Sequence, residues 1–129
     1  MDDFINLKKI QEKLALNNWS LYEYQKEFLK YQSQKKFRQI LISSEIGTGK
    51  TITAFLPFFK NEINKTKKKV IYISPLKSIN TTLKERLTEL SLNLGIKCKI
   101  ENRTSDISYI TKKKQLFNVT DILLTTPET

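Results

Sequence analysis

The chain has 129 residues, of which 39% are hydrophobic and 28% charged, a balance typical of a single globular domain. The formal net charge is +10 and histidine is absent, which excludes a serine–histidine–aspartate catalytic arrangement. The one cysteine, Cys98, excludes an internal disulfide and a zinc cluster and fits a reducing, cytoplasmic setting. No apolar run approaches membrane-spanning length, so no membrane partner is expected. The basic charge favours a polyanionic partner, although the same net charge would arise in an organism whose proteins are generally rich in lysine.

Two amphipathic helices are predicted at the N-terminus. Apolar residues at helical spacing predict the first helix over residues 4–16, and Asn17-Asn18 ends it. Ser20, followed three residues later by Glu23, forms a capping-box pattern that predicts the start of the second helix.

A glycine-containing loop separates an apolar run at residues 40–42 from an amphipathic run at residues 52–63. The order strand, loop, helix is the context that a phosphate-binding loop requires. Gly47 and Gly49 permit positive φ and a close approach of backbone N–H groups to phosphate oxygens. The unpaired N–H groups at the start of the helix would then face the phosphates.

The side chains of the loop fit the same chemistry. Lys50 is expected to reach the β- and γ-phosphates of a nucleotide, and the Thr51 hydroxyl is expected to bind Mg²⁺. The alternative is a glycine-containing turn with an incidental lysine. Ser44 stands where the pattern G-x-x-x-x-G-K-T has its first glycine. The nucleotide-binding residues predicted in the loop are Ser44, Gly47, Thr48, Gly49, Lys50 and Thr51.

Strands and helices alternate through the rest of the chain. The predicted elements are a strand at 70–73, a helix at 76–94 closed by Gly95, a strand at 96–100, a helix at 106–117 and a strand at 122–124. This alternation predicts an α/β fold, a three-layer parallel sheet with helices on both faces. Functional residues of such sheets lie at the carboxyl ends of the strands. The polar segments 44–51, 74–77 and 125–128 are all expected there.

These segments, in this order, resemble the first half of the ATP-binding domain of a superfamily-two helicase. Ser74-Pro75-Leu76-Lys77 resembles motif Ia, and Thr125-Thr126-Pro127-Glu128 resembles motif Ib. Gln25 is placed like the glutamine that reads adenine in such enzymes. Residues 103–106 and 121–128 are similar to the Lhr-type branch, which includes the ligase-associated DExH helicases.

The resemblance implies an incomplete P-loop NTPase fold of the RecA-like type. It divides the chain into N-terminal helices at 1–36, with the Q-motif-like Gln25, and the first part of the ATP-binding domain at 37–129. It implies ATP and Mg²⁺ as cofactors and single-stranded or duplex nucleic acid as the partner, with DNA favoured over RNA. The nucleic-acid contacts that it implies are Pro75, Lys77, Thr126 and Pro127.

The 129 residues do not include the DExH motif that supplies the carboxylates for Mg²⁺ and water in the family. We therefore expect the N-terminal fragment of a helicase, through truncation, a split gene or a disrupted reading frame, without activity alone. In the case of a split gene, the remainder of the helicase is a further partner. The alternatives are a non-enzymatic nucleic-acid or partner-binding remnant and a P-loop kinase or other ATPase. In the family, the strands that flank residues 38–43 come from sequence after motif Ib, so this apolar segment is expected to lack its neighbours.

Overall fold

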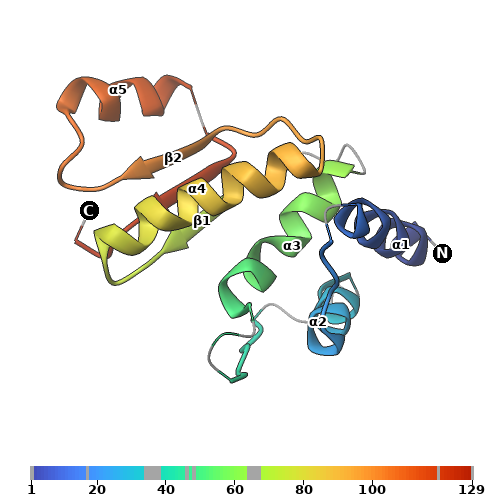
Figure 1. The fold of residues 1–129 in the computed structure, drawn as a ribbon. Helices are drawn as coiled ribbons and strands as arrows, with labels where there is room; N and C mark the ends of the chain where they lie inside the picture. The colour runs from blue at the N-terminus through green and yellow to red at the C-terminus, as the bar shows by residue number, and fades with distance from the viewer. Residues whose placement is uncertain are drawn as a thin grey trace. The chain divides into compact units, whose positions relative to one another are not determined.

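A computed structural model describes residues 2–16, 18–33, 39–45, 47, 49–63, 68–118 and 120–128 (Figure 1). The chain divides into two compact units, residues 1–67 and 68–129. The domain boundary expected between residues 36 and 37 does not coincide with the boundary between these two units, and it stays a prediction. Among the described residues, no helix is both long enough and apolar enough to cross a membrane.

The first unit is helical. It contains α1 (Asp2–Ala15), α2 (Glu23–Ser33) and α3 (Lys50–Ile63), and both α1 and α2 contact α3. Pro57 lies inside α3 without ending it. The apolar core of the unit is made by side chains that are at most 2% exposed, namely Ile10, Leu14, Leu29, Phe55, Leu56, Phe58 and Phe59.

The start of α2 differs from the predicted capping box. The helix begins at Glu23, and the backbone N–H of Tyr22 donates to Gln25 Oε1 at 2.9 Å. The side chain three positions into the helix therefore caps its first turn, as in a capping box shifted by two residues. The helix start predicted from Ser20 and Glu23 was wrong, because two polar residues at this spacing also occur in ordinary loops.

The apolar run at residues 40–42 does not form the predicted strand. Residues 39–45 have no regular secondary structure, and Leu41 is 93% exposed. A strand needs a hydrogen-bonded neighbour, and the sheet of the described residues consists of β1, β3 and β2 only. Apolar composition alone therefore did not make this segment a strand.

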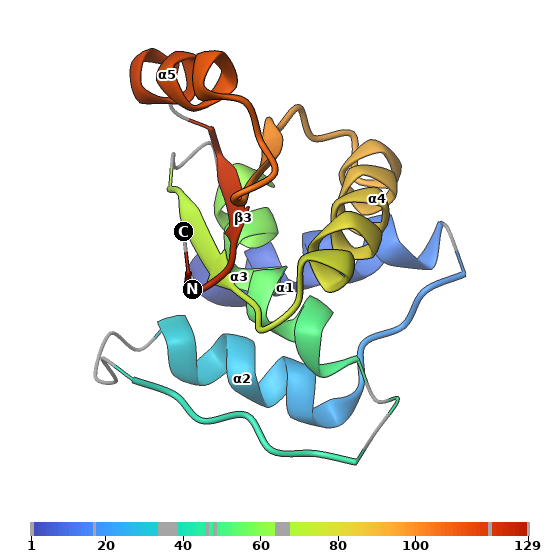
Figure 2. The ribbon, with the colours of Figure 1, turned by 90° about the vertical axis from the view of Figure 1, so that its left-hand side faces the viewer.

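The second unit is built on a parallel sheet with the order β1-β3-β2 (Figure 2). The strands are β1 (Val70–Ile73), β2 (Ile100–Arg103) and β3 (Ile122–Thr125). Both outer strands pair with β3 in the same register, since Val70 and Ile100 both lie opposite Ile122. The α/β class and the parallel strands are thus as predicted.

Helix α4 (Lys77–Asn93), predicted at 76–94, packs against β2 and β3 and buries Leu83, Leu87 and Leu90. The helix ends as predicted at Gly95, whose φ is +68°. The N–H groups of Gly95 and Ile96 donate to the carbonyls of Leu92 and Ser91, which is a Schellman motif. On β1, Ile71 and Ile73 alternate with half-buried residues and are 69% and 62% exposed.

The observed bounds of two elements differ from the predicted ones. The predicted strand at 96–100 is paired only from Ile100 to Arg103, because the register with β3 begins at Ile100. The helix predicted from residue 106 is α5 (Tyr109–Phe117), and it begins after Ser108. The Ser108 hydroxyl accepts from the Thr111 N–H at 3.2 Å, so the N-cap fixes the start of α5.

Candidate functional site

The glycine positions of the predicted phosphate-binding loop have the backbone conformation that the prediction required. Gly47 and Gly49 have φ values of +81° and +76°, which side chains with a Cβ rarely adopt. A Cβ built at Gly47 meets no atom within 4 Å, so the loop has open space beside it. Helix α3 begins directly afterwards, at Lys50. Thr48, which was also assigned to the site, lies outside the described residues.

Lys50 lies across this loop. Its Nζ donates to the backbone carbonyl of Ser44 at 2.7 Å, so the ammonium group is held over the loop backbone. Thr51, the next residue, is exposed in the first turn of α3. The structure thus brings Ser44, Gly49, Lys50 and Thr51 together around the start of one helix, where unpaired N–H groups favour an anion.

Gln25 also lies beside this loop, and its side chain is buried and hydrogen-bonded to the protein. It is 5% exposed, and its Nε2 donates to Thr53 Oγ1 at 2.8 Å and lies 3.5 Å from the Gly49 carbonyl oxygen. Thr53 is fully buried and was missed from the sequence. The available signal was a hydroxyl four residues after Gly49, on a helix face that is otherwise apolar.

The second unit brings the motif Ia and motif Ib segments together at the carboxyl edge of the sheet. The N–H of Ser74 donates to the carbonyl oxygen of Thr125 at 3.0 Å, and Asn80 Nδ2 donates to the same oxygen at 3.0 Å. Asn80 is fully buried, and its Oδ1 has no hydrogen-bond partner among the described residues. This edge is the one where functional residues of an α/β sheet are expected.

The predicted nucleic-acid contacts differ in their exposure at this edge. Pro75, Lys77 and Pro127 are exposed, whereas Thr126 is 3% exposed. Lys77 is the first residue of α4, and no side chain caps that helix start. The exposed residues form a surface edge, and Thr126 lies beneath it.

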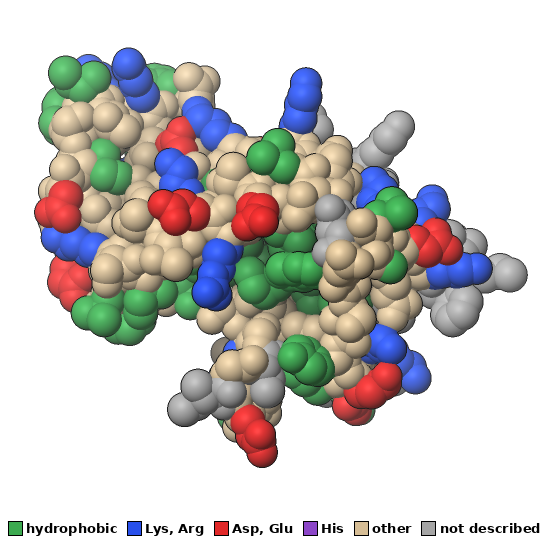
Figure 3. Space-filling view, viewed as in Figure 1, with side chains coloured by type: hydrophobic (Ala, Val, Ile, Leu, Met, Phe, Trp, Pro, Cys, Tyr) green, Lys and Arg blue, Asp and Glu red, His purple; other side chains and the backbone are tan. Residues whose placement is uncertain are grey.

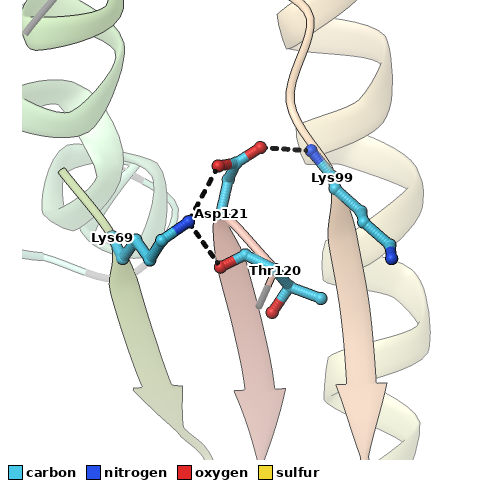
Figure 4. Close-up of polar contacts among 4 residues, drawn as sticks. All are labelled: Lys69, Lys99, Thr120 and Asp121. Atoms are coloured by element: carbon cyan, nitrogen blue, oxygen red, sulfur yellow. Dashed lines mark hydrogen bonds and ion pairs between the residues drawn. The ribbon is translucent and has the colours of Figure 1, made fainter. Parts of the chain in front are cut away.

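Asp121, the nearest acidic residue before motif Ib, belongs to the opposite edge (Figure 4). Its carboxylate accepts from the Lys99 backbone N–H at 2.8 Å and from Lys69 Nζ at 3.3 Å. The N–H of Val70 donates to the Asp121 carbonyl at 2.9 Å. Asp121 thus ties the amino-terminal ends of all three strands, at the edge opposite to the one where functional residues of such a sheet are expected. The described residues contain no cluster of three His, Cys, Asp or Glu side chains for a metal ion.

Charge on the visible face of the second unit is mixed. Figure 3 shows Lys and Arg side chains among Asp and Glu side chains rather than one continuous basic field. The formal net charge of +10 therefore does not define a site on this face by itself. The candidates for nucleic-acid contact are therefore individual residues at the carboxyl edge rather than a continuous basic surface.

Comparison with known proteins defines the class. The sequence matches the DEAD/DEAH box helicase family model over residues 22–129, and the chain belongs to that family. Within it, the chain is similar to Lhr-type helicases. It is 39% identical to the ATP-dependent helicase Lhr-Core of Sulfolobus acidocaldarius and 34% identical to Lhr-Core of Methanocaldococcus jannaschii, over 73% and 70% of its length. It spans only 12% and 13% of those relatives.

Solved structures show the same fold. The helicase MrfA bound to DNA and AMPPNP matches 93% of this chain and 17% of its own, with a TM-score of 0.80 and 22% identity. The Mycobacterium smegmatis helicase Lhr bound to ssDNA and AMP-PNP matches 92% of this chain and 17% of its own, with a TM-score of 0.73 and 22% identity. The predicted fold class and the predicted Lhr-type resemblance are confirmed.

Proposed function

We propose that the chain is the N-terminal part of the first RecA-like domain of an ATP-dependent Lhr-type helicase. It would carry a site for the nucleotide phosphates and a sheet edge that contacts nucleic acid. The observation that carries the nucleotide site is the loop itself. Gly47 and Gly49 have positive φ immediately before a helix whose first residue is a lysine held over the loop. This arrangement combines backbone donors, a helix N-terminus and a positive charge beside the loop.

The residues present supply some, but not all, of the groups that ATP and Mg²⁺ require. The open space at Gly47 suits phosphate oxygens, and Lys50 exchanges its bond to the Ser44 carbonyl for the β- and γ-phosphates. The exposed Thr51 hydroxyl is the one Mg²⁺ ligand that we assign in the described part of the chain. A bound Mg²⁺ would offset the phosphate charge. Ser44 and Thr48 complete the proposed phosphate loop.

Nucleic acid is the proposed partner at the carboxyl edge of the second unit. Lys77 supplies a charge at an uncapped helix start, and Pro75 and Pro127 are exposed beside the joined strand ends. Such contacts bind the sugar–phosphate backbone without reading sequence. Thr126 supports the edge from below. We favour DNA, because the similar MrfA and Lhr structures contain it. The proposed location is the cytoplasm, which suits a single cysteine, Cys98, that is in no disulfide.

The experiment that tests the nucleotide site is calorimetric titration of the 129-residue chain with ATP and Mg²⁺. Replacing Lys50 by alanine removes a charge-assisted contact of about 1.5–3 kcal/mol, so affinity should fall by about tenfold to a hundredfold. Lys84→Ala is the matched control, because Lys84 is exposed on α4 and outside both candidate sites. Equal affinities in all three proteins would leave the alternative, a nucleic-acid-binding protein without a nucleotide site.

A further inference from the structure

Helix α5 turns its apolar side away from the sheet of its own unit. Its large apolar side chains are mostly exposed, at 78% for Tyr109, 67% for Ile110, 66% for Leu116 and 79% for Phe117. Its one buried side chain is the polar Gln115, whose Nε2 donates to the backbone carbonyl of Asn102 on β2 at 3.1 Å. An amphipathic helix ordinarily buries its apolar side, so α5 has the reverse orientation.

The composition of β2 explains this orientation. Three of the four residues of the strand are polar, namely Glu101, Asn102 and Arg103. A polar strand favours an amide such as Gln115 above it rather than a leucine or a phenylalanine. Gln115 Oε1 and Asn102 Oδ1 are nevertheless buried without a hydrogen-bond partner among the described residues. The packing of α5 on its own sheet therefore does not explain why the helix contains four large apolar residues.

The exposed apolar residues form one continuous side of the helix. The two apolar pairs, at 109–110 and 116–117, are seven residues apart, which is close to two helical turns. Lys113 lies between the pairs on the same side, and Lys112 and Lys114 border that side. Figure 3 shows hydrophobic and basic side chains together over α5. The surface that we call the α5 face consists of Tyr109, Ile110, Lys113, Leu116 and Phe117.

The charge and the chemistry of the α5 face limit its partners. The helix has three lysines and no acidic residue, and the chain has a formal net charge of +10, so a second copy would bring like charges together. Nucleic acid would match the charge, but Ile110 and Leu116 are aliphatic and cannot stack on a base, and interfaces with nucleic acid are more polar than those between proteins. An apolar strip bordered by lysines fits an acidic amphipathic helix.

We propose that the α5 face is a docking surface for an acidic amphipathic helix of a partner protein. The apolar residues of the partner would pack along Tyr109, Leu116 and Phe117, and its carboxylates would pair with Lys112 and Lys114. The proposal depends neither on the nucleotide site nor on the nucleic-acid contacts at the carboxyl edge.

The test uses the 129-residue chain and two synthetic peptides. The acidic peptide has three heptads with leucine at positions a, d and e and glutamate elsewhere, and in the basic peptide lysine replaces every glutamate. Each peptide carries a fluorophore, and fluorescence anisotropy measures binding. We expect the acidic peptide to bind and the basic peptide to remain free. An acidic peptide that binds no better than the basic one would overturn the proposal.

Substitutions on the α5 face separate docking from general charge attraction. Phe117→Ser and Leu116→Ser keep the charge and should each weaken binding of the acidic peptide by about tenfold, because an apolar anchor is lost. Leu92→Ser is the matched control, since Leu92 is 74% exposed on α4, and the affinity should stay within about twofold of wild type. Thermal melts of all three variants should coincide with wild type, because the replaced side chains are exposed. Equal affinities in the three variants would indicate attraction by net charge alone and would overturn the proposal.

Three further measurements on Phe117→Ser test the other occupants. Binding of a single-stranded oligonucleotide, binding of vesicles that contain phosphatidylserine, and the sedimentation coefficient should all match wild type. A loss of oligonucleotide or vesicle binding, with peptide binding unchanged, would assign the α5 face to nucleic acid or to lipid and overturn the proposal. A shift from dimer to monomer in this variant would assign the face to a second copy, with the same consequence.

Discussion

Lys77 Nζ lies 3.0 Å from Asp106 Oδ1, and this ion pair joins the first residue of α4 to the loop after β2. The two side chains are 45% and 73% exposed, so water weakens the pair and it contributes little to folding. Its importance lies in binding, because Asp106 occupies the charge that is proposed to meet a nucleic-acid phosphate.

We therefore expect Asp106→Asn to raise affinity for a single-stranded oligonucleotide by about twofold to fivefold, the size of an exposed ion pair. Lys77→Ala should lower affinity and reduce the salt slope by about 0.7, as for one phosphate contact on a single strand. Fluorescence anisotropy at several salt concentrations measures both. Glu85→Gln is the control, since Glu85 is an exposed carboxylate elsewhere on α4. An equal gain from Glu85→Gln would mean that net charge alone matters.

Asp121 should be needed for stability rather than for chemistry. Asp121→Asn replaces the carboxylate that accepts from the Lys99 N–H and Lys69 Nζ, at the point where all three strands begin. We expect the free energy of unfolding to fall by about 1–2 kcal/mol, because charge-assisted bonds are lost. Urea denaturation gives the value, with Asp106→Asn as a matched loss of an exposed carboxylate. A stability equal to wild type would show that the strand ends do not depend on this residue.

Leu41 should promote self-association of the isolated chain. It is 93% exposed, its segment has no strand partner among the described residues, and such apolar segments pair with other copies. Leu41→Lys should leave the melting curve unchanged and shift sedimentation toward the monomer. Leu92→Lys makes the same substitution at an exposed position of α4 and should change sedimentation less. A wild-type chain that sediments as a clean monomer contradicts this prediction.

The 129-residue polypeptide should bind nucleotide without turning it over. Its sequence has no DExH tetrapeptide, and its described residues offer no acidic cluster to hold Mg²⁺ and orient water. A phosphate-release assay with and without single-stranded DNA should stay at background. Turnover that DNA stimulates and Lys50→Ala abolishes would reveal an acidic residue whose role has been misjudged.

Local signals in the sequence were reliable for particular elements. The helix at 76–94 and its end at Gly95 were predicted correctly, because an amphipathic helix face and a Schellman cap depend on a few neighbouring residues. The strand predicted at residues 40–42 is not formed, which agrees with the expectation that this segment lacks its neighbouring strands, because apolar composition alone does not supply a hydrogen-bonded partner.

The candidate site shows the same difference between features set by neighbouring residues and features set by residues distant in the chain. The glycines and Lys50 were found because their spacing within one loop carries the chemistry. Thr53 was missed because its importance arises from a bond to Gln25, which is distant in the chain. The ion pair between Lys77 and Asp106 was missed for the same reason, since it joins segments that follow two different strands.

The central position of β3 has a consequence for the order of folding during synthesis. In the part of the chain that the structure describes, β1 and β2 each pair with β3 alone, yet β3 follows both of them in the chain. Neither strand has its neighbour until residues 122–125 have left the ribosome, and the leucines of α4 have no completed sheet to cover before then. Closure of this unit is therefore a single late event, and the pace of translation sets how long that apolar helix face stays in water.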